Sequence, residues 1–204
     1  PLKMPALTRS AARQLYKTTD TTCLVLRESV TAKADAVWTY RNNVDVYTDK
    51  SRANTANPQV DHTIEIQLAE LALVRAFSNE KGDACSMATR QATSIVGAAV
   101  NCHANLNVTS AKINHAKRGP VSAALNRVAD DRLRTVQIEQ MVRQGRGKWM
   151  LEDGTWSKIE TSIVMSYDMM ADALCDVDAM PAASRLVQST MDELNQLLCS
   201  LHLV

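Results

Sequence analysis

Apolar residues at helical spacing are the feature of this sequence that most limits its fold. Four segments carry them, at residues 64–77, 86–101, 158–175 and 181–203. Spacing of three to four residues places such side chains on one face of a helix, and these faces must pack together to leave water. Aromatic residues make up only 4% of the chain, so aliphatic side chains and nine Met must fill the core. We therefore predict a mainly α protein of the α+β class, in which short extended segments accompany the helices.

The remaining elements are predicted from turn and capping signals. We expect helices at residues 7–17, 32–40, 111–118 and 121–144, a polar loop at 42–58 with a short strand at 44–47, an extended start at Val60, irregular backbone at 101–108, and a hairpin at 151–156. The pair Thr109-Ser110 is a capping signal before the third of these helices. The pair Asp153-Gly154 is a hairpin-turn signal, with Trp149 and Trp156 on either side.

Length and composition limit the class of protein. A chain of 204 residues corresponds to about one domain, so we predict a single domain over residues 1–204. A hydrophobic share of 46% excludes a disordered chain. The longest uncharged apolar run, residues 95–100, is far shorter than the ~18 residues of a membrane helix. We expect no membrane partner.

Five cysteines are present and none forms a CxxC pair, which argues against a zinc ribbon. They allow two disulfides and a spare thiol, or five reduced thiols.

The first residue is Pro1, which suits a trimmed secreted protein or a fragment. We expect either a secreted protein or a soluble intracellular one. If the protein is secreted, we predict that the sequon Asn107-Val108-Thr109 stays unused or that the site proposed below is impaired, because a glycan there would crowd it.

The charges are distributed unevenly along the chain. Residues 105–148 hold nine Lys and Arg against three Asp and Glu, a balance of +6. Residues 149–204 hold two bases against nine acids, a balance of −7, and are predicted to form an acidic helical scaffold. A basic block of this kind suits a polyanionic partner such as nucleic acid, although it is also typical of a solvated helix face.

The dipeptide Asp61-His62 combines two chemical abilities. A carboxylate is a hard ligand suited to Mg²⁺ or Mn²⁺, and an imidazole can take a proton from water near neutral pH. In an extended strand the two side chains point to opposite sides, so a bend or groove would have to gather them. Glu65, one helical turn further, is a candidate additional ligand, an acceptor behind the ligands, or an exposed carboxylate.

A second pattern follows at residues 105–117. Asn105 is followed after nine residues by Asn114 and after twelve by Lys117, and the last two share a helix face. Together with Asp61-His62, this pattern resembles the HNH (ββα-metal) endonuclease family in its Asp-His…Asn…Asn form. The resemblance covers residues 61–117, and it implies a small ββα-metal-like motif embedded in the helical domain. The stretch between His62 and Asn105 is longer than in compact members, and it contains two predicted helices.

The resemblance implies a role for each matching residue. Asp61 and Asn114 would bind a divalent metal, His62 would be the general base, and Asn105 would orient His62 through its other ring nitrogen. Lys117 or Arg118 could contact phosphate. His115, next to Asn114, is an alternative ligand. The expected cofactor is Mg²⁺ or Mn²⁺, which would stabilise the developing phosphate charge.

The function that follows is a metal-dependent endonuclease acting on DNA or RNA with little sequence specificity. A secreted toxin or effector would suit it, and a target or inhibitor protein is not identified by the sequence. The alternative is a non-enzymatic helical protein that binds a partner protein through its charged faces. The two hypotheses differ in one structural requirement. Only the nuclease requires four side chains to lie within reach of one metal ion: Asp61, His62, Asn105 and Asn114.

Overall fold

The computed structural model describes residues 21–26, 28–80, 83, 85–118, 151, 154–175 and 177–200. Along the chain, the main elements are α2 (Ala34–Tyr40), β1 (Pro58–His62), α3 (Ile66–Glu80), α4 (Met87–Val100), β2 (Leu106–Ser110), a helix at residues 111–118, α7 (Thr155–Cys175) and α8 (Pro181–Ser200). The described chain is mostly helical with one two-stranded antiparallel sheet, which confirms the mainly α, α+β prediction. The predicted helices at 7–17 and 121–144, and Trp149, lie outside the described residues.

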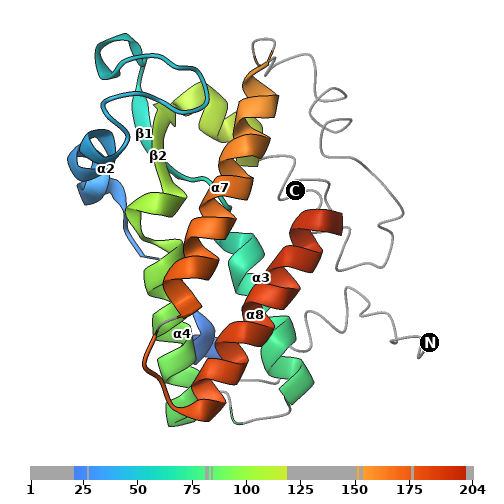
Figure 1. The fold of residues 1–204 in the computed structure, drawn as a ribbon. Helices are drawn as coiled ribbons and strands as arrows, with labels where there is room; N and C mark the ends of the chain where they lie inside the picture. Colours follow the sequence, from blue (N-terminus) through green and yellow to red (C-terminus); the bar gives the residue numbers. More distant parts are fainter. Residues whose placement is uncertain are drawn as a thin grey trace.

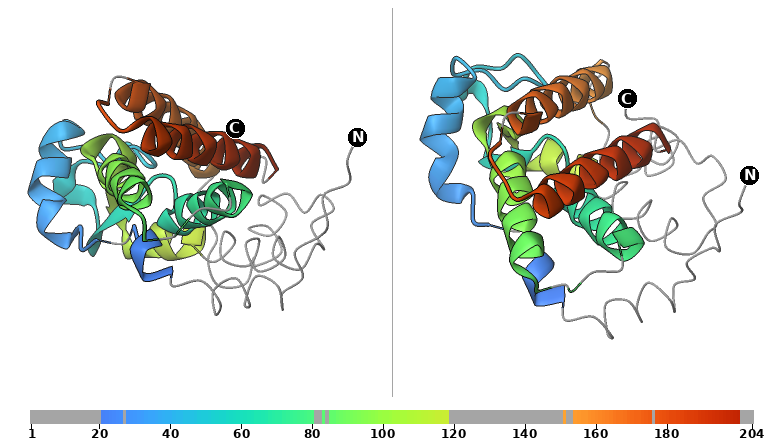
Figure 2. Two further views of the ribbon diagram at one scale, coloured as in Figure 1. Left: turned by 90° about the horizontal axis from the view of Figure 1, so that it is seen from below. Right: turned by 60° about the horizontal axis from the view of Figure 1, so that its bottom comes forward.

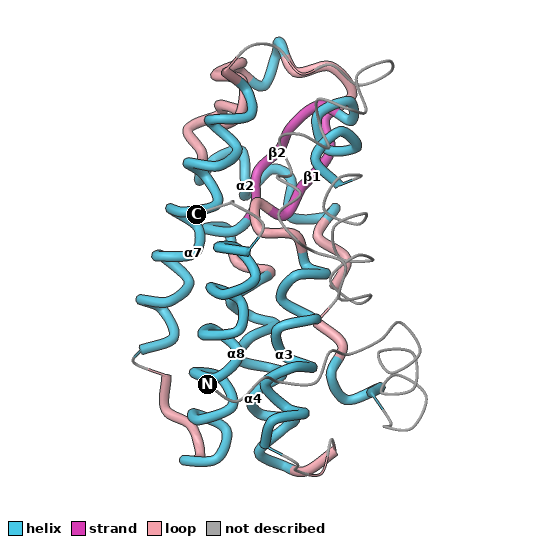
Figure 3. The backbone as a smooth tube through the Cα atoms, turned by 90° about the vertical axis from the view of Figure 1, so that its right-hand side faces the viewer, coloured by secondary structure: helices cyan, strands magenta, loops and turns pink. Residues whose placement is uncertain are grey.

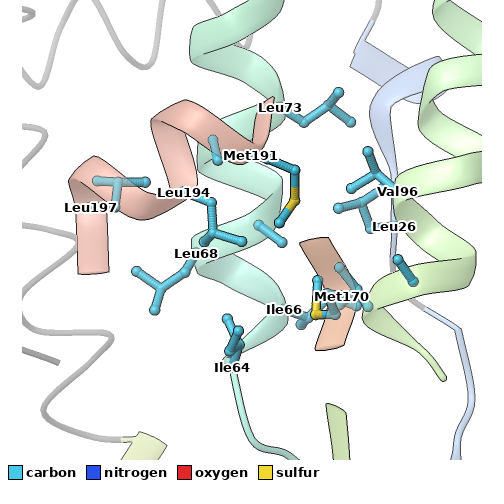
Figure 4. Packing of buried hydrophobic residues seen from close by; sticks show 14 of the residues in the cluster. Leu26, Ile64, Ile66, Leu68, Leu73, Val96, Met170, Met191, Leu194 and Leu197 are labelled. Atoms are coloured by element: carbon cyan, nitrogen blue, oxygen red, sulfur yellow. The ribbon is translucent and has the colours of Figure 1, made fainter. Parts of the chain in front are cut away.

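The long helices form two layers. Helices α7 and α8 lie over α3 and α4, and α8 packs against both members of the second layer (Figures 1 and 2). Leucine, isoleucine, valine and methionine side chains fill the space between the layers (Figure 4). Leu68 and Leu73 of α3 meet Met191 and Leu194 of α8 there, and each is at most 4% exposed. The core is therefore aliphatic, as the sequence predicts.

The sheet lies at one end of these layers (Figure 3). Its register runs from Pro58 opposite Ser110 to His62 opposite Leu106. Alternate residues of a strand share a face, so Leu106 and Val108 of β2 form an apolar face that Val37 and Trp38 of α2 cover. The other face carries polar side chains.

The helix at residues 111–118 follows β2 at once. Ser110 caps it, because its hydroxyl accepts a hydrogen bond from the backbone N–H of Ile113 at 3.4 Å. Strand β1, strand β2 and this helix form a ββα unit, while α3 and α4 occupy the long connection between the strands. The unit joins residues that are far apart in the sequence.

Asparagine and aspartate shape the loop before β1. The backbone has positive φ at Asn42 (55°), Asn43 (59°), Asp49 (57°) and Asn57 (46°), a conformation that these residue types tolerate better than most. The loop is polar as predicted, but the expected strand at 44–47 is reduced to a single bridge between Val44 and Ser51.

Two predicted elements are wrong. The stretch at 101–108 is not irregular throughout, because β2 begins at Leu106. Its polar residues are buried, which hides the usual alternation of a surface strand. The hairpin at 151–156 is absent from its described part, because α7 already begins at Thr155. Trp156 packs against the core from that helix.

One disulfide connects Cys23 with Cys85, with the Cα atoms 5.6 Å apart. It joins the 3₁₀ turn at Thr21–Leu24 to the chain just before α4. The other three cysteines, Cys102, Cys175 and Cys199, are free thiols. Among the residues described, no helix has the length and apolar character needed to cross a membrane.

Candidate functional site

Strand β1 separates the two residues of the Asp61-His62 pair. The strand is extended through both positions, so their side chains point to opposite faces of the sheet. Asp61 faces Lys117 of the helix at 111–118, whereas the His62 ring contacts Asn101 at the end of α4. The strand does not bend to bring the two side chains together, so the Asp61 face and the His62 face of the sheet are described separately.

On the Asp61 side, a lysine ammonium lies among oxygen atoms. The Nζ of Lys117 is 2.6 Å from Asp61 Oδ2, 3.4 Å from the Tyr47 hydroxyl and 3.3 Å from the carbonyl oxygen of Thr63. It also donates to the carbonyl oxygen of His62. Lys117 is 1% exposed, so this cation is enclosed by the chain.

The surroundings keep Lys117 charged and Tyr47 neutral. Burial opposes the charge of the ammonium, but the charges of Asp61 and Glu65 hold the pKa of Lys117 above its ordinary value. Burial, and then the Asp61 charge, raise the pKa of Tyr47. The Tyr47 hydroxyl can therefore donate to Asp61 Oδ2, at 2.9 Å. This arrangement is a buried ion pair with a neutral donor beside it.

Glu65 lies at the edge of this cluster. Its Oε1 is 3.5 Å from Lys117 Nζ, and within the described part of the chain it accepts no hydrogen bond. Burial raises the pKa of Glu65, and the nearby ammonium offsets this only in part. Glu65 is 7% exposed, so the option of a solvent-exposed carboxylate does not hold.

Asp45 fixes the position of Tyr47. Its Oδ1 accepts from the Tyr47 backbone N–H at 3.0 Å and from the Asn107 amide at 2.8 Å, and its Oδ2 accepts from the Thr109 hydroxyl at 2.8 Å. The loop before β1 is thus attached to β2. Asn107 is fully buried in this network.

On the other face, Asn101 holds the His62 ring. The distance between His62 Nε2 and Asn101 Oδ1 is 2.9 Å. The Asn101 Nδ2 donates to the carbonyl oxygens of Leu26 (3.0 Å) and Gly97 (2.8 Å), which fixes the amide with Oδ1 toward the ring. An amide oxygen only accepts, so Nε2 must carry the hydrogen. In the neutral imidazole, Nδ1 is then the nitrogen that takes a proton.

A second cation lies beside this histidine. The ammonium of Lys33 donates to the Asn101 carbonyl oxygen at 3.0 Å and pairs with Glu28 at 2.7 Å. Asn101 ends α4, and a cation is favoured at a helix C-terminus, where carbonyl oxygens lack partners. Imidazole and ammonium therefore contact one asparagine.

Asn105 does not have its expected contact. Its Oδ1 accepts from the Ile64 backbone N–H at 2.7 Å, and its Nδ2 donates to the carbonyl oxygens of Ile64 (3.2 Å) and Val100 (2.8 Å). These bonds use both amide hydrogens and hold the amide oxygen against Ile64, so Asn105 fixes the backbone after β1 rather than the ring of His62. The expected asparagine–histidine contact exists, but Asn101 makes it.

The other predicted residues lie apart from one another. Asn114 donates to Gln59 Oε1 at 3.1 Å, and His115 and Arg118 are exposed. Lys117 is enclosed against Asp61, so it does not face a phosphate, contrary to its expected role.

These placements concern the residues expected to bind Mg²⁺. Asp61 is engaged by an ammonium and Asn114 by a glutamine, so the pair does not form a metal site as arranged. Over the described ranges, no group of three or more His, Cys, Asp and Glu is arranged to hold a metal ion. At Asp61, the position of a cation is taken by Lys117 Nζ, 2.6 Å from Oδ2.

An open groove of about 640 Å³ lies beside Asn101. It runs between the segment at 21–28 and α4, and polar side chains line part of it: Glu28, Arg90, Thr93, Ser94 and Asn101. Asn101 both borders this groove and holds His62. Sequence reasoning missed Asn101 and Lys33. The sequence has asparagines at both 101 and 105, but their spacing does not indicate which of the two contacts His62.

Comparison with protein-family models finds no match, and neither curated proteins nor solved structures match the chain.

Proposed function

We propose that this protein cleaves phosphodiester bonds in nucleic acid, with His62 as the proton acceptor. The contact of His62 Nε2 with Asn101 Oδ1 carries the proposal, because it selects the ring tautomer in which Nδ1 can act as a base. His62 is half-buried at the end of an extended strand, where a base can be both oriented and reached. Asn101 is a positioning residue in this scheme.

Charge supports a polyanionic substrate. Lys33 holds an ammonium close to the same asparagine, and Arg90 lines the adjacent groove. Residues 105–148 add a balance of +6 in the sequence, and the exposed Lys112 and Arg118 belong to this block. Positive charge of this kind concentrates a nucleic acid near the site.

The test is cleavage of plasmid DNA and total RNA by the full chain and by His62→Ala. We expect the variant to lose about 100-fold or more of the rate, the usual contribution of a general base. His103→Ala is the matched control, because His103 is an exposed histidine in the neighbouring 3₁₀ turn. Equal activity of His62→Ala and wild type would contradict the role of His62. Failure of the folded protein to cut either polymer would favour the partner-binding alternative.

Asn101→Asp tests the positioning role separately. A carboxylate facing Nε2 favours the imidazolium form, so the base needs a higher pH to lose its proton. We expect the rising limb of the pH–rate profile to move to higher pH. A uniform loss of rate with an unmoved profile would indicate a purely structural role for Asn101.

A further inference from the structure

The ammonium of Lys117 occupies the place at Asp61 that a metal ion would need. It is surrounded by Asp61 Oδ2, the Tyr47 hydroxyl and two backbone carbonyl oxygens, with Glu65 at 3.5 Å. Carboxylate, hydroxyl and carbonyl oxygens are the donor set of a hard cation. Here the chain supplies that cation itself, from a side chain that is 1% exposed.

The consequence concerns the nucleophile. Hydrolysis of DNA needs an activated water, and a bound metal is the usual means of lowering the pKa of water. A histidine without a metal is a weak base for this purpose, since its ordinary pKa of about 6.5 lies far below the pKa of water. The 2′-hydroxyl of RNA already lies next to the phosphate, so its attack is intramolecular and gains the large advantage of proximity.

Resting on the proposed cleavage activity, we propose that the substrate is RNA, and that its own 2′-hydroxyl attacks the phosphate without a divalent metal. His62 Nδ1 takes the 2′-hydroxyl proton, and the 2′-oxygen forms a bond to phosphorus. The bond between phosphorus and the 5′-oxygen breaks, and the 5′-oxygen takes a proton from water. The resulting hydroxide takes the proton back from His62. The products are a 2′,3′-cyclic phosphate and a 5′-hydroxyl, with no net proton change.

The cations at the site serve different purposes in this scheme. Lys33, which shares Asn101 with His62 and pairs with Glu28 at 2.7 Å, can turn to the charge that develops on the phosphate oxygens. Lys117 is on the other face of β1, where it neutralises Asp61. The 2′-hydroxyl also distinguishes RNA from DNA.

The experiment compares an RNA oligonucleotide with the same sequence in DNA and in 2′-O-methyl RNA. Each is incubated with the full chain in excess EDTA and, separately, with Mg²⁺ or Mn²⁺, and the product ends are identified by mass spectrometry. We expect RNA cleavage at the same rate in EDTA, 2′,3′-cyclic phosphate ends, and no cleavage of the two controls. His62→Ala should abolish this cleavage.

The outcomes separate the two proposals. Cleavage that requires a metal, or cleavage of DNA, would overturn the RNA inference while leaving nuclease activity intact. Failure to cleave any polymer under any condition would overturn the proposed function itself. Independently of activity, Mn²⁺ binding can be followed by electron paramagnetic resonance. We expect the wild type to bind no stoichiometric Mn²⁺. A Mn²⁺ site that is present in the wild type and lost in Asp61→Asn would refute the assignment of Lys117 as the cation at Asp61.

Discussion

Replacing Lys117 with methionine should strongly destabilise the fold. Methionine keeps most of the length of the side chain but removes the ammonium, which leaves the charge of Asp61 buried with the Tyr47 hydroxyl as its donor. Removing one partner of a buried ion pair costs about 3–5 kcal/mol, because the remaining charge lacks compensation. Domains have a free energy of unfolding of about 5–15 kcal/mol, so this is a large share of the total.

Urea denaturation at neutral pH measures the effect. With a typical slope of about 2 kcal/mol per molar urea, the midpoint of Lys117→Met should fall by about 1.5–2.5 M. Lys112→Met is the control, since Lys112 is exposed on the same helix, and it should change stability by less than about 0.5 kcal/mol.

A double variant tests the cause. Asp61→Asn removes the uncompensated charge and still offers an oxygen to the Tyr47 hydroxyl, so Asp61→Asn with Lys117→Met should recover about half or more of the loss. If Lys117→Met stays within about 1 kcal/mol of the wild type, the ammonium is not bound as tightly as its contacts imply, and the reasoning is refuted.

Three further predictions concern stability. Asn105→Ala should lower the free energy of unfolding by about 3 kcal/mol, because buried backbone groups lose their partners; a loss below about 1 kcal/mol in urea would contradict this. Replacing Cys23 and Cys85 by serine should cost about 4 kcal/mol by loop-closure entropy at a sequence separation of 62, and an unchanged Tm would count against it. Burial raises the pKa of Glu65 in the folded state, so its contribution is favourable below the ordinary pKa of about 4.3 and is lost as pH rises. Glu65→Gln should therefore gain stability relative to wild type between pH ~4 and ~7, and a relative loss over that range would show that pairing with Lys117 dominates.

The helices could be predicted from the sequence because apolar spacing is a local property. The predictions at 64–77, 86–101 and 158–175 correspond to α3, α4 and α7 within a few residues. Strand β2 could not be recognised, because Asn107 and Thr109 are polar yet buried against Asp45. Burial of a polar residue depends on a partner far away in the sequence.

The candidate site was only partly predictable for the same reason. The resemblance singled out the two segments that form the ββα unit, and β1 and β2 do pair. It did not indicate that Lys117 faces Asp61, or that Asn101 rather than Asn105 holds His62. Those contacts depend on strand alternation and on the end of α4, which a residue spacing does not specify.

The long connection between the two strands sets an order on folding. Asp61 pairs with Asn107, and α3 and α4 lie between them. Closing so long a loop costs entropy that the short strands alone cannot offset, so the helices must shorten it first. We expect conservative substitutions in β2, such as Val108→Ala, to accelerate unfolding and to leave the folding rate nearly unchanged in stopped-flow experiments. On the ribosome, His62 would then be synthesised early and yet reach its partner strand only after residue 110 has emerged.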